Sequence, residues 1–305
     1  MDVLLRADKL TKHYGSVVAL NSATFDVTDG VTGLLGSNGA GKSTAIKLFL
    51  GLIKPTSGSM QVLGVETTHN ISVRARLGYM PEHDCLPNNV AATEFLTHMA
   101  QVSGLPPAQA RSRAADTLRH VGLFEERYRP IGGYSTGMKQ RVKLAQALVH
   151  DPALILLDEP TAGLDPGGRE EMLDLVRKTH SEFGISLMLS SHLMGDVERT
   201  CDRIIVLEDG HVVQQGAVTG FTEELETLFV EVEDRRSEFV AALQRLNVNA
   251  TTEDSAVMIV GASEETYDLI ARALAESEAP LRRMGPRRHA LTELFTGAPA
   301  AGGAK

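Results

Sequence analysis

A short glycine-rich segment near the start of the chain carries the clearest chemistry in the sequence. Residues 36–44 read Gly-Ser-Asn-Gly-Ala-Gly-Lys-Ser-Thr. The glycines let the backbone turn successive N–H groups inward, where they can wrap a row of phosphate oxygens. Lys42 adds a mobile positive charge for the terminal phosphates, and the hydroxyl of Ser43 is a natural ligand for Mg²⁺. We therefore expect a nucleoside triphosphate to contact the residues of this loop, which are Gly36, Ser37, Asn38, Gly39, Ala40, Gly41, Lys42, Ser43 and Thr44.

The segments on either side of this loop match that chemistry. Residues 30–35 have the pattern of a short buried strand, and residues 43–50 that of the opening of a helix, whose N-terminus attracts anions. The alternative is a glycine-rich turn between a strand and a helix that binds no ligand. The loop sequence fits a phosphate-binding loop and a ligand-free turn alike. A nucleotide site would also need a metal ligand and a group that activates water, from other segments of the chain.

A pair of acids follows an apolar run in the middle of the chain. Residues 154–157 read Leu-Ile-Leu-Leu and are followed by Asp158 and Glu159. A strand buried on both faces would deliver these acids at its carboxyl end, where open α/β sheets bind ligands. Asp158 is the expected partner of Mg²⁺, directly or through water, and Glu159 is the expected general base for an attacking water. The alternative is a strand that ends in two solvated acids.

Two further side chains are candidates on weaker grounds. His192 follows an expected strand at 185–190, where its imidazole could bond the γ-phosphate and the attacking water. The chain holds ten histidines, so an imidazole with a purely structural partner is the alternative. Tyr14 could stack on an adenine, and an ordinary half-buried tyrosine fits its position equally well.

Residues 134–141, together with the glycine-rich loop and the acid pair, follow the motif order of a known protein family. They read Tyr-Ser-Thr-Gly-Met-Lys-Gln-Arg and are followed by a helical segment and then by the strand that ends in Asp158 and Glu159. This order resembles the nucleotide-binding subunits of ATP-binding-cassette (ABC) transporters over about residues 1–220. The resemblance implies an α/β fold, a P-loop NTPase core of the ABC type with a helical subdomain, and ATP with Mg²⁺ as its ligands.

The resemblance also assigns roles to individual residues. It implies catalytic roles for Lys42, Glu159 and His192, the last as the family's switch histidine, and an adenine-stacking role for Tyr14. It implies that two copies pack head to tail, so that each ATP also meets residues of the other copy, which are Ser135, Thr136, Gly137 and, in the family's D-loop, Asp165. The implied partners are a second copy and an integral membrane permease, which would place the chain peripherally on the cytoplasmic face of the cell membrane.

The sequence departs from the usual family pattern at two places. The signature segment has Tyr134, Thr136 and Met138 where leucine, glycine and glutamine are usual, and Glu82 stands where a glutamine is usual. Both departures resemble the exporter-type branch, in which the ATPase and its permease are separate chains. A carboxylate near Mg²⁺ adds a negative charge that an amide lacks. We expect Glu82 to keep a contact with the metal or with water.

The pattern of strand-like and helix-like segments divides the chain into a large and a small part. We expect an ATPase domain at 1–220 with a helical insert at about 83–150, whose helices fall at 90–102 and 107–121. Alternating strand and helix patterns then predict a small α+β C-terminal domain at 221–296. Residues 297–305 have the composition of a disordered tail.

The overall composition limits the classes of function. The net charge of −9 argues against a nucleic-acid partner, since such proteins present a basic face. No apolar run approaches the length of a membrane span. Cys85 and Cys201 lack metal-ligand spacing. A soluble ABC-type ATPase switch uncoupled from transport is the rival function, and a phosphoryl-transfer kinase would leave Ser135 and His192 without a role. The transported substance is not encoded in these motifs.

Overall fold

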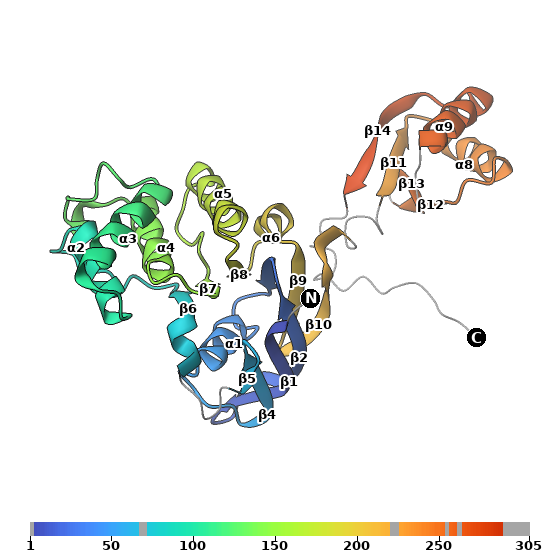
Figure 1. Ribbon diagram of the computed structural model, residues 1–305. Coiled ribbons are helices and arrows are strands. Elements are labelled where there is room, and N and C mark those ends of the chain that lie inside the picture. Colours follow the sequence, from blue (N-terminus) through green and yellow to red (C-terminus); the bar gives the residue numbers. More distant parts are fainter. Residues whose placement is uncertain (1–2, 67–71, 220–225, 254–255, 261–263, 289–305) are drawn as a thin grey trace. The chain divides into compact units, whose positions relative to one another are not determined.

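The computed structural model describes residues 3–66, 72–219, 226–253, 256–260 and 264–288. The chain forms two compact units, Met1–Ala217 and Val218–Lys305 (Figure 1). The tail predicted at 297–305 lies outside the described residues. Within the described part, no helix combines the length and the apolar character that crossing a bilayer requires.

A six-stranded sheet forms the centre of the first unit. Its strand order is β10-β9-β3-β8-β7-β6, with every neighbouring pair parallel except β10 and β9. Strands β3, β7 and β8 are buried along their whole length, which explains their continuous apolar runs. The six strands are β3 (Val31–Leu35), β6 (Leu77–Met80), β7 (Leu154–Asp158), β8 (Ser186–Ser191), β9 (Arg203–Glu208) and β10 (His211–Ala217).

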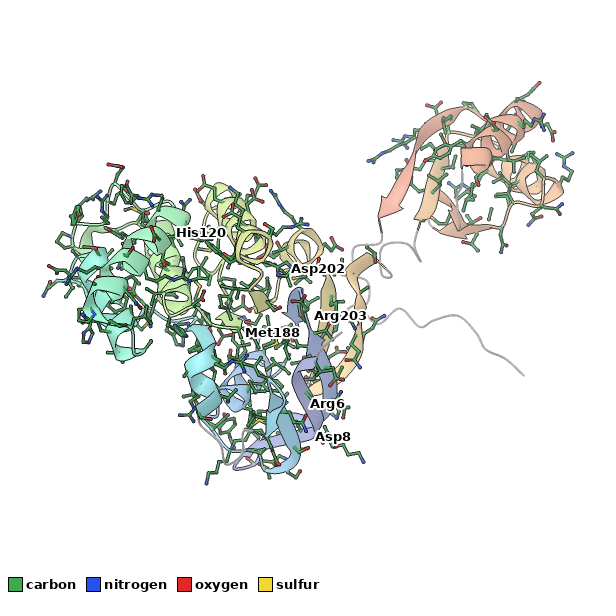
Figure 2. All side chains as sticks on the ribbon, in the orientation of Figure 1. Arg6, Asp8, His120, Met188, Asp202 and Arg203 are labelled. Atoms are coloured by element: carbon green, nitrogen blue, oxygen red, sulfur yellow. The ribbon has the colours of Figure 1, made fainter. Side chains whose placement is uncertain are left out.

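A second, antiparallel sheet with the order β2-β1-β4-β5 belongs to the same unit. Its strands are β1 (Val3–Tyr14), β2 (Val17–Thr28), β4 (Ser57–Val62) and β5 (Val65–Glu66). Helix α1 (Lys42–Phe49) shares one hydrophobic core with both sheets. Phe49 of α1 meets Phe25 of β2 edge to face at 5.8 Å. Met188 of β8 lies inside this unit, whereas Arg6 and Asp8 of β1 lie at its surface (Figure 2).

The predicted helical insert is a group of three helices. They are α2 (Ala92–Val102), α3 (Pro107–His120) and α4 (Thr136–Leu148), and they lie together in Figure 1. A 3-10 turn, η1 (Ser72–Arg76), precedes β6, and another, η2 (Ile131–Gly133), precedes α4. Helices α5 (Pro166–Phe183) and α6 (Met194–Thr200) pack against strand β8.

In the second unit, the described residues from 226 onward form one antiparallel sheet and two helices. Its elements follow in the order strand, helix, strand, strand, helix, strand, and the sheet order is β12-β13-β11-β14. This is the ferredoxin-like arrangement. Its elements are β11 (Glu226–Val232), α8 (Arg236–Arg245), β12 (Ala250–Glu253), β13 (Ala256–Val260), α9 (Glu264–Ser277) and β14 (Leu281–Arg288). Side chains of β11, β13 and both helices form its core.

His150, in the turn between α4 and β7, gives the first unit a pH-dependent stability. Its Nε2–H donates to the carbonyl oxygen of Leu77 at 2.9 Å, and burial lowers its pKa from the ordinary value of 6.5. The unfolded chain then binds more protons than the folded chain when the pH falls through this range, so stability rises with pH and is lost on acidification.

We predict that the thermal midpoint falls between about pH 7 and about pH 5, and that His150→Gln makes this fall shallower. Glutamine keeps a donor for Leu77 but does not ionise. His98→Gln, on an exposed position of α2, is the control and should follow the wild type. Calorimetry measures both, and equal pH slopes for His150→Gln and the wild type would contradict the assignment.

Candidate functional site

The glycine-rich loop joins β3 to α1, and its glycines are required for distinct reasons. Gly39 and Gly41 have φ values of 90° and 104°, which L side chains rarely adopt. A Cβ on Gly41 would lie 2.3 Å from the carbonyl oxygen of Ala19, and one on Gly36 would lie 2.5 Å from that of Leu207. The loop therefore packs tightly against the main chain of both sheets, at β2 and at β9.

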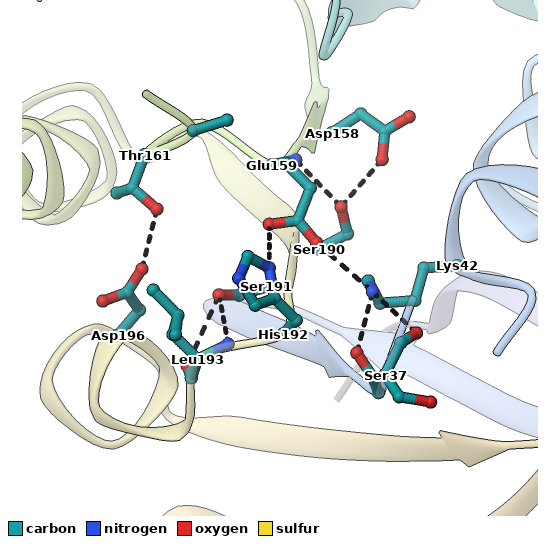
Figure 3. Close-up of polar contacts among 12 residues, drawn as sticks. Ser37, Lys42, Asp158, Glu159, Thr161, Ser190, Ser191, His192, Leu193 and Asp196 are labelled. Carbon is teal, nitrogen blue, oxygen red and sulfur yellow. Dashed lines mark hydrogen bonds and ion pairs between the residues drawn. The ribbon is translucent and has the colours of Figure 1, made fainter. Parts of the chain in front are cut away.

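Lys42, the first residue of α1, is bent back over this loop. Its Nζ donates to the carbonyl oxygens of Gly36 at 2.8 Å and Ser37 at 3.2 Å. It also forms a buried ion pair with Oε1 of Glu159 at 3.2 Å (Figure 3). That contact lacks hydrogen-bond geometry, so Oε1 has no hydrogen-bond donor among the described residues. An anionic ligand with several oxygens offers the ammonium better partners than these.

Two oxygen groups from distant segments meet beside the lysine. The hydroxyl of Ser43 in α1 donates to Oδ1 of Asp158 at the end of β7, at 3.0 Å. Hydroxyl and carboxylate oxygens suit Mg²⁺, which binds through one or two carboxylates together with water and substrate phosphates. This pair of oxygens fits a Mg²⁺ that takes its remaining ligands from water and phosphate. The described residues contain no cluster of three His, Cys, Asp or Glu that could hold a metal ion.

Glu159 is held in an unusual backbone conformation by Ser190. Its φ is 47°, a left-handed value that costs a residue other than glycine about 1–3 kcal/mol. Its N–H donates to Oγ of Ser190 at 2.9 Å, and the same hydroxyl donates to Oδ1 of Asp158 at 2.8 Å. Oε2 of Glu159 lies 2.9 Å from Nδ1 of His192 (Figure 3). Ser190, whose role the sequence did not predict, thus links Asp158 to the main chain of Glu159, and the Glu159 carboxylate contacts His192.

A pocket of about 320 Å³ opens beside Glu159, and neither Asp158 nor His192 is among its lining residues. Its walls come from the loop, from α1 and from three other segments, and its lining residues are Ala19, Asn38, Gly39, Gly41, Lys42, Ser43, Thr44, Glu82 and Glu159. Gly36, Ser37 and Ala40 are not in this lining, and the Ala40 N–H donates to the Ser37 carbonyl at 3.1 Å. Tyr14 does not line it either. Its ring is 47% exposed, with the Lys12 ammonium 5.1 Å away.

The remaining predicted residues line a different cleft, of about 710 Å³. Ser135, Thr136, Gly137 and Asp165 all belong to it, and it shares no residue with the first pocket. Oγ of Ser135 accepts from Met138 N at 3.3 Å and caps α4, and Oδ1 of Asp165 accepts from Gly168 N at 2.9 Å and caps α5. Two capped helix N-termini therefore face one cleft. The Asp165 carboxylate already occupies the N-terminus of α5, so the N-terminus of α4 is the end that suits an anion.

Helix α4 connects this cleft to its surroundings through side chains that the motifs did not identify. Nε2 of Gln140 donates to the carbonyl oxygen of Ala162, at 2.9 Å, in the segment between Glu159 and Asp165. Lys143, which is 3% exposed, donates to the carbonyl oxygen of Glu82 at 2.8 Å. No signal in the sequence marks either contact, because each joins residues far apart in the chain.

We predict that Ser190→Ala lowers the free energy of unfolding by about 1–3 kcal/mol, because it leaves the N–H of Glu159 buried without an acceptor. Urea denaturation measures the change, with Ser181→Ala on the exposed side of α5 as the control. Equal stability of the two variants would show that this hydroxyl does not hold the backbone of Glu159.

Comparison with known proteins agrees with this geometry. The profile of the ABC transporter family matches residues 20–162. The linearmycin resistance ATP-binding protein LnrL of Bacillus subtilis is 32% identical over 286 residues, which cover 90% of this chain and 91% of that protein. The bacitracin transport ATP-binding protein BcrA of Bacillus licheniformis is 36% identical over 217 residues, 70% of each chain.

Solved structures agree as well. A bacterial ABC transporter cassette in dimeric form has a TM-score of 0.64 and 25% identity, and covers 70% of this chain and 98% of that one. The family and the α/β P-loop fold predicted from the sequence are confirmed. The chain therefore belongs to the ABC transporter family, as an ATP-binding and ATP-hydrolysing subunit.

Proposed function

We propose that two copies of this chain bind two Mg-ATP head to tail and hydrolyse them, and that this cycle drives export through a separate membrane permease. The chain would then lie peripherally at the cytoplasmic face of the cell membrane. Residues 1–220 carry the ATPase in this proposal, with the insert at about 83–150 next to Glu82 as the contact for the permease. The unit at 221–296 is accessory.

The separation of the two pockets within one chain carries this proposal. Lys42 and Ser43 line one pocket, and Ser135 and Gly137 line the other, with no residue in common. Each pocket offers a helix N-terminus, of α1 or of α4, to an anion. A triphosphate between two copies would receive both helix ends, and the dimeric form of a related cassette supports that geometry.

The residues of the first pocket suit hydrolysis. When a nucleotide binds, Lys42 exchanges the carbonyl oxygens of Gly36 and Ser37 for phosphate oxygens, which also releases Glu159 from its ion pair. Mg²⁺, when bound beside Ser43 and Asp158, neutralises charge on the phosphate oxygens. Glu159 then accepts a proton from the attacking water, and His192 orients the carboxylate through Oε2.

Export is favoured over the rival function by the relatives. One is a bacitracin transport protein and another a linearmycin resistance protein, and both are ATP-binding proteins by name. A soluble ABC-type ATPase switch uncoupled from transport is the second candidate. Co-purification with a protein that spans the membrane several times separates the two, because only an exporter subunit has such a partner.

We predict that Glu159→Gln keeps ATP binding, lowers turnover by about 10²–10⁴ and accumulates a dimer in the presence of Mg-ATP. Glutamine has the shape of glutamate but does not accept the proton. Steady-state phosphate release measures turnover, and size-exclusion chromatography with light scattering measures the dimer.

Glu208→Gln, at an exposed position at the end of β9, is the matched control and should behave like the wild type. A Glu159→Gln variant with turnover near that of the wild type would remove Glu159 as the base. A variant that loses turnover but stays monomeric in Mg-ATP would contradict the shared site.

A further inference from the structure

Two lysines of α4 contact the segment that follows β6. Lys139 and Lys143 are one helical turn apart, so they share a face of the helix. Nζ of Lys143 donates to the carbonyl oxygens of Glu82 at 2.8 Å and His83 at 3.4 Å. Nζ of Lys139 lies 3.3 Å from Oδ2 of Asp84. Three consecutive residues of the segment are therefore attached to α4.

The buried ammonium of Lys143 costs the folded state desolvation free energy. The side chain is 3% exposed, and burial lowers the pKa of its ammonium, against the opposing effect of nearby Cys85, Asp84, Glu82 and Asp158. A buried charge destabilises a fold unless it is paired or hydrogen-bonded. An apolar side chain would fill the same space without that cost, but it would not hold the backbone at Glu82.

The attached segment and the helix serve different pockets. Glu82 lines the pocket that contains Lys42 and Ser43, whereas α4 begins at the cleft that contains Ser135 and Gly137. A displacement at the start of α4 would reach the main chain of Glu82 through the helix and its bond from Lys143. Within one chain, the two lysines thus connect the two halves of different nucleotide sites.

We propose that Lys143 is a positioning residue that couples the two ATP sites of the dimer. It keeps the main chain of Glu82 at a fixed position relative to α4, and the ion pair of Lys139 with Asp84 holds the same segment. This inference rests on the proposed head-to-tail dimer. A nucleotide bound against Ser135 of one copy would then favour the arrangement in which Glu82 of that same copy faces its own nucleotide. Binding at one site thereby strengthens binding at the other, and a coupling of this kind is reciprocal.

The test compares Lys143→Met with the wild type in ATP hydrolysis by the full chain. Methionine keeps most of the length and the apolar stem but lacks the charge and the donors. We expect the Hill coefficient for Mg-ATP to fall toward one and the apparent affinity to fall roughly five-fold or more. Lys178→Met, at an exposed position of α5, is the matched control and should leave both values unchanged.

A second measurement separates positioning from general stability. In a Glu82→Ala background, Lys143→Met should add little further loss, because the lysine acts through Glu82. A role in stability alone would give additive losses in both backgrounds and an unchanged Hill coefficient, and this result overturns the proposal. If Lys143→Met does not fold, Lys139→Met provides the same test at the surface, with a smaller loss of cooperativity expected.

The wild type distinguishes this proposal from the function on which it rests. A wild type that dimerises in Mg-ATP and hydrolyses it cooperatively supports the proposed function. If that cooperativity survives in both lysine variants, the role of Lys143 in coupling the two sites is overturned and the proposed function stands. A wild type that hydrolyses ATP as a monomer, with a Hill coefficient of one, overturns both.

Discussion

The parallel pairing of β3, β8 and β7 is the constraint on which the site depends. Because these neighbouring strands run in the same direction, their carboxyl ends meet at one edge of the sheet. That edge places Lys42, Ser190 and His192 in contact with Glu159, although they come from segments that are far from Glu159 in the sequence. Protein oxygens already surround the ammonium of Lys42, so a triphosphate that enters the pocket would replace contacts within the protein.

The same sheet explains why one chain holds two incomplete sites. The loop after β3 and Glu159 after β7 line one pocket, while α4 and α5 present their capped N-termini to another cleft. Each pocket presents a helix N-terminus, but the two pockets have no lining residue in common. The proposed head-to-tail dimer accounts for this arrangement, because a second copy would supply what each pocket lacks.

The sequence predicts the parts of the site that are local. The loop at 36–44 and the acids at 158–159 were identifiable because each stands directly after a continuous apolar strand. Ser190 and Lys143 were not, because hydrogen bonds across 31 and 61 positions leave no periodic signal. Strand β12, with four residues, is too short to show alternation. The adenine contact of Tyr14 stays a prediction.

The central claim, that each ATP lies between two copies, is tested most directly by mixing two damaged chains. Lys42→Ala removes the phosphate loop's charge, and Gly137→Asp puts a carboxylate into the other cleft, where the new Cβ has room, 3.8 Å from Leu164. Each variant alone should be inactive. Random pairing of the two should restore up to about a quarter of the wild-type ATPase rate, because half of the dimers then hold one intact site out of two. A mixture no more active than its components would contradict the account.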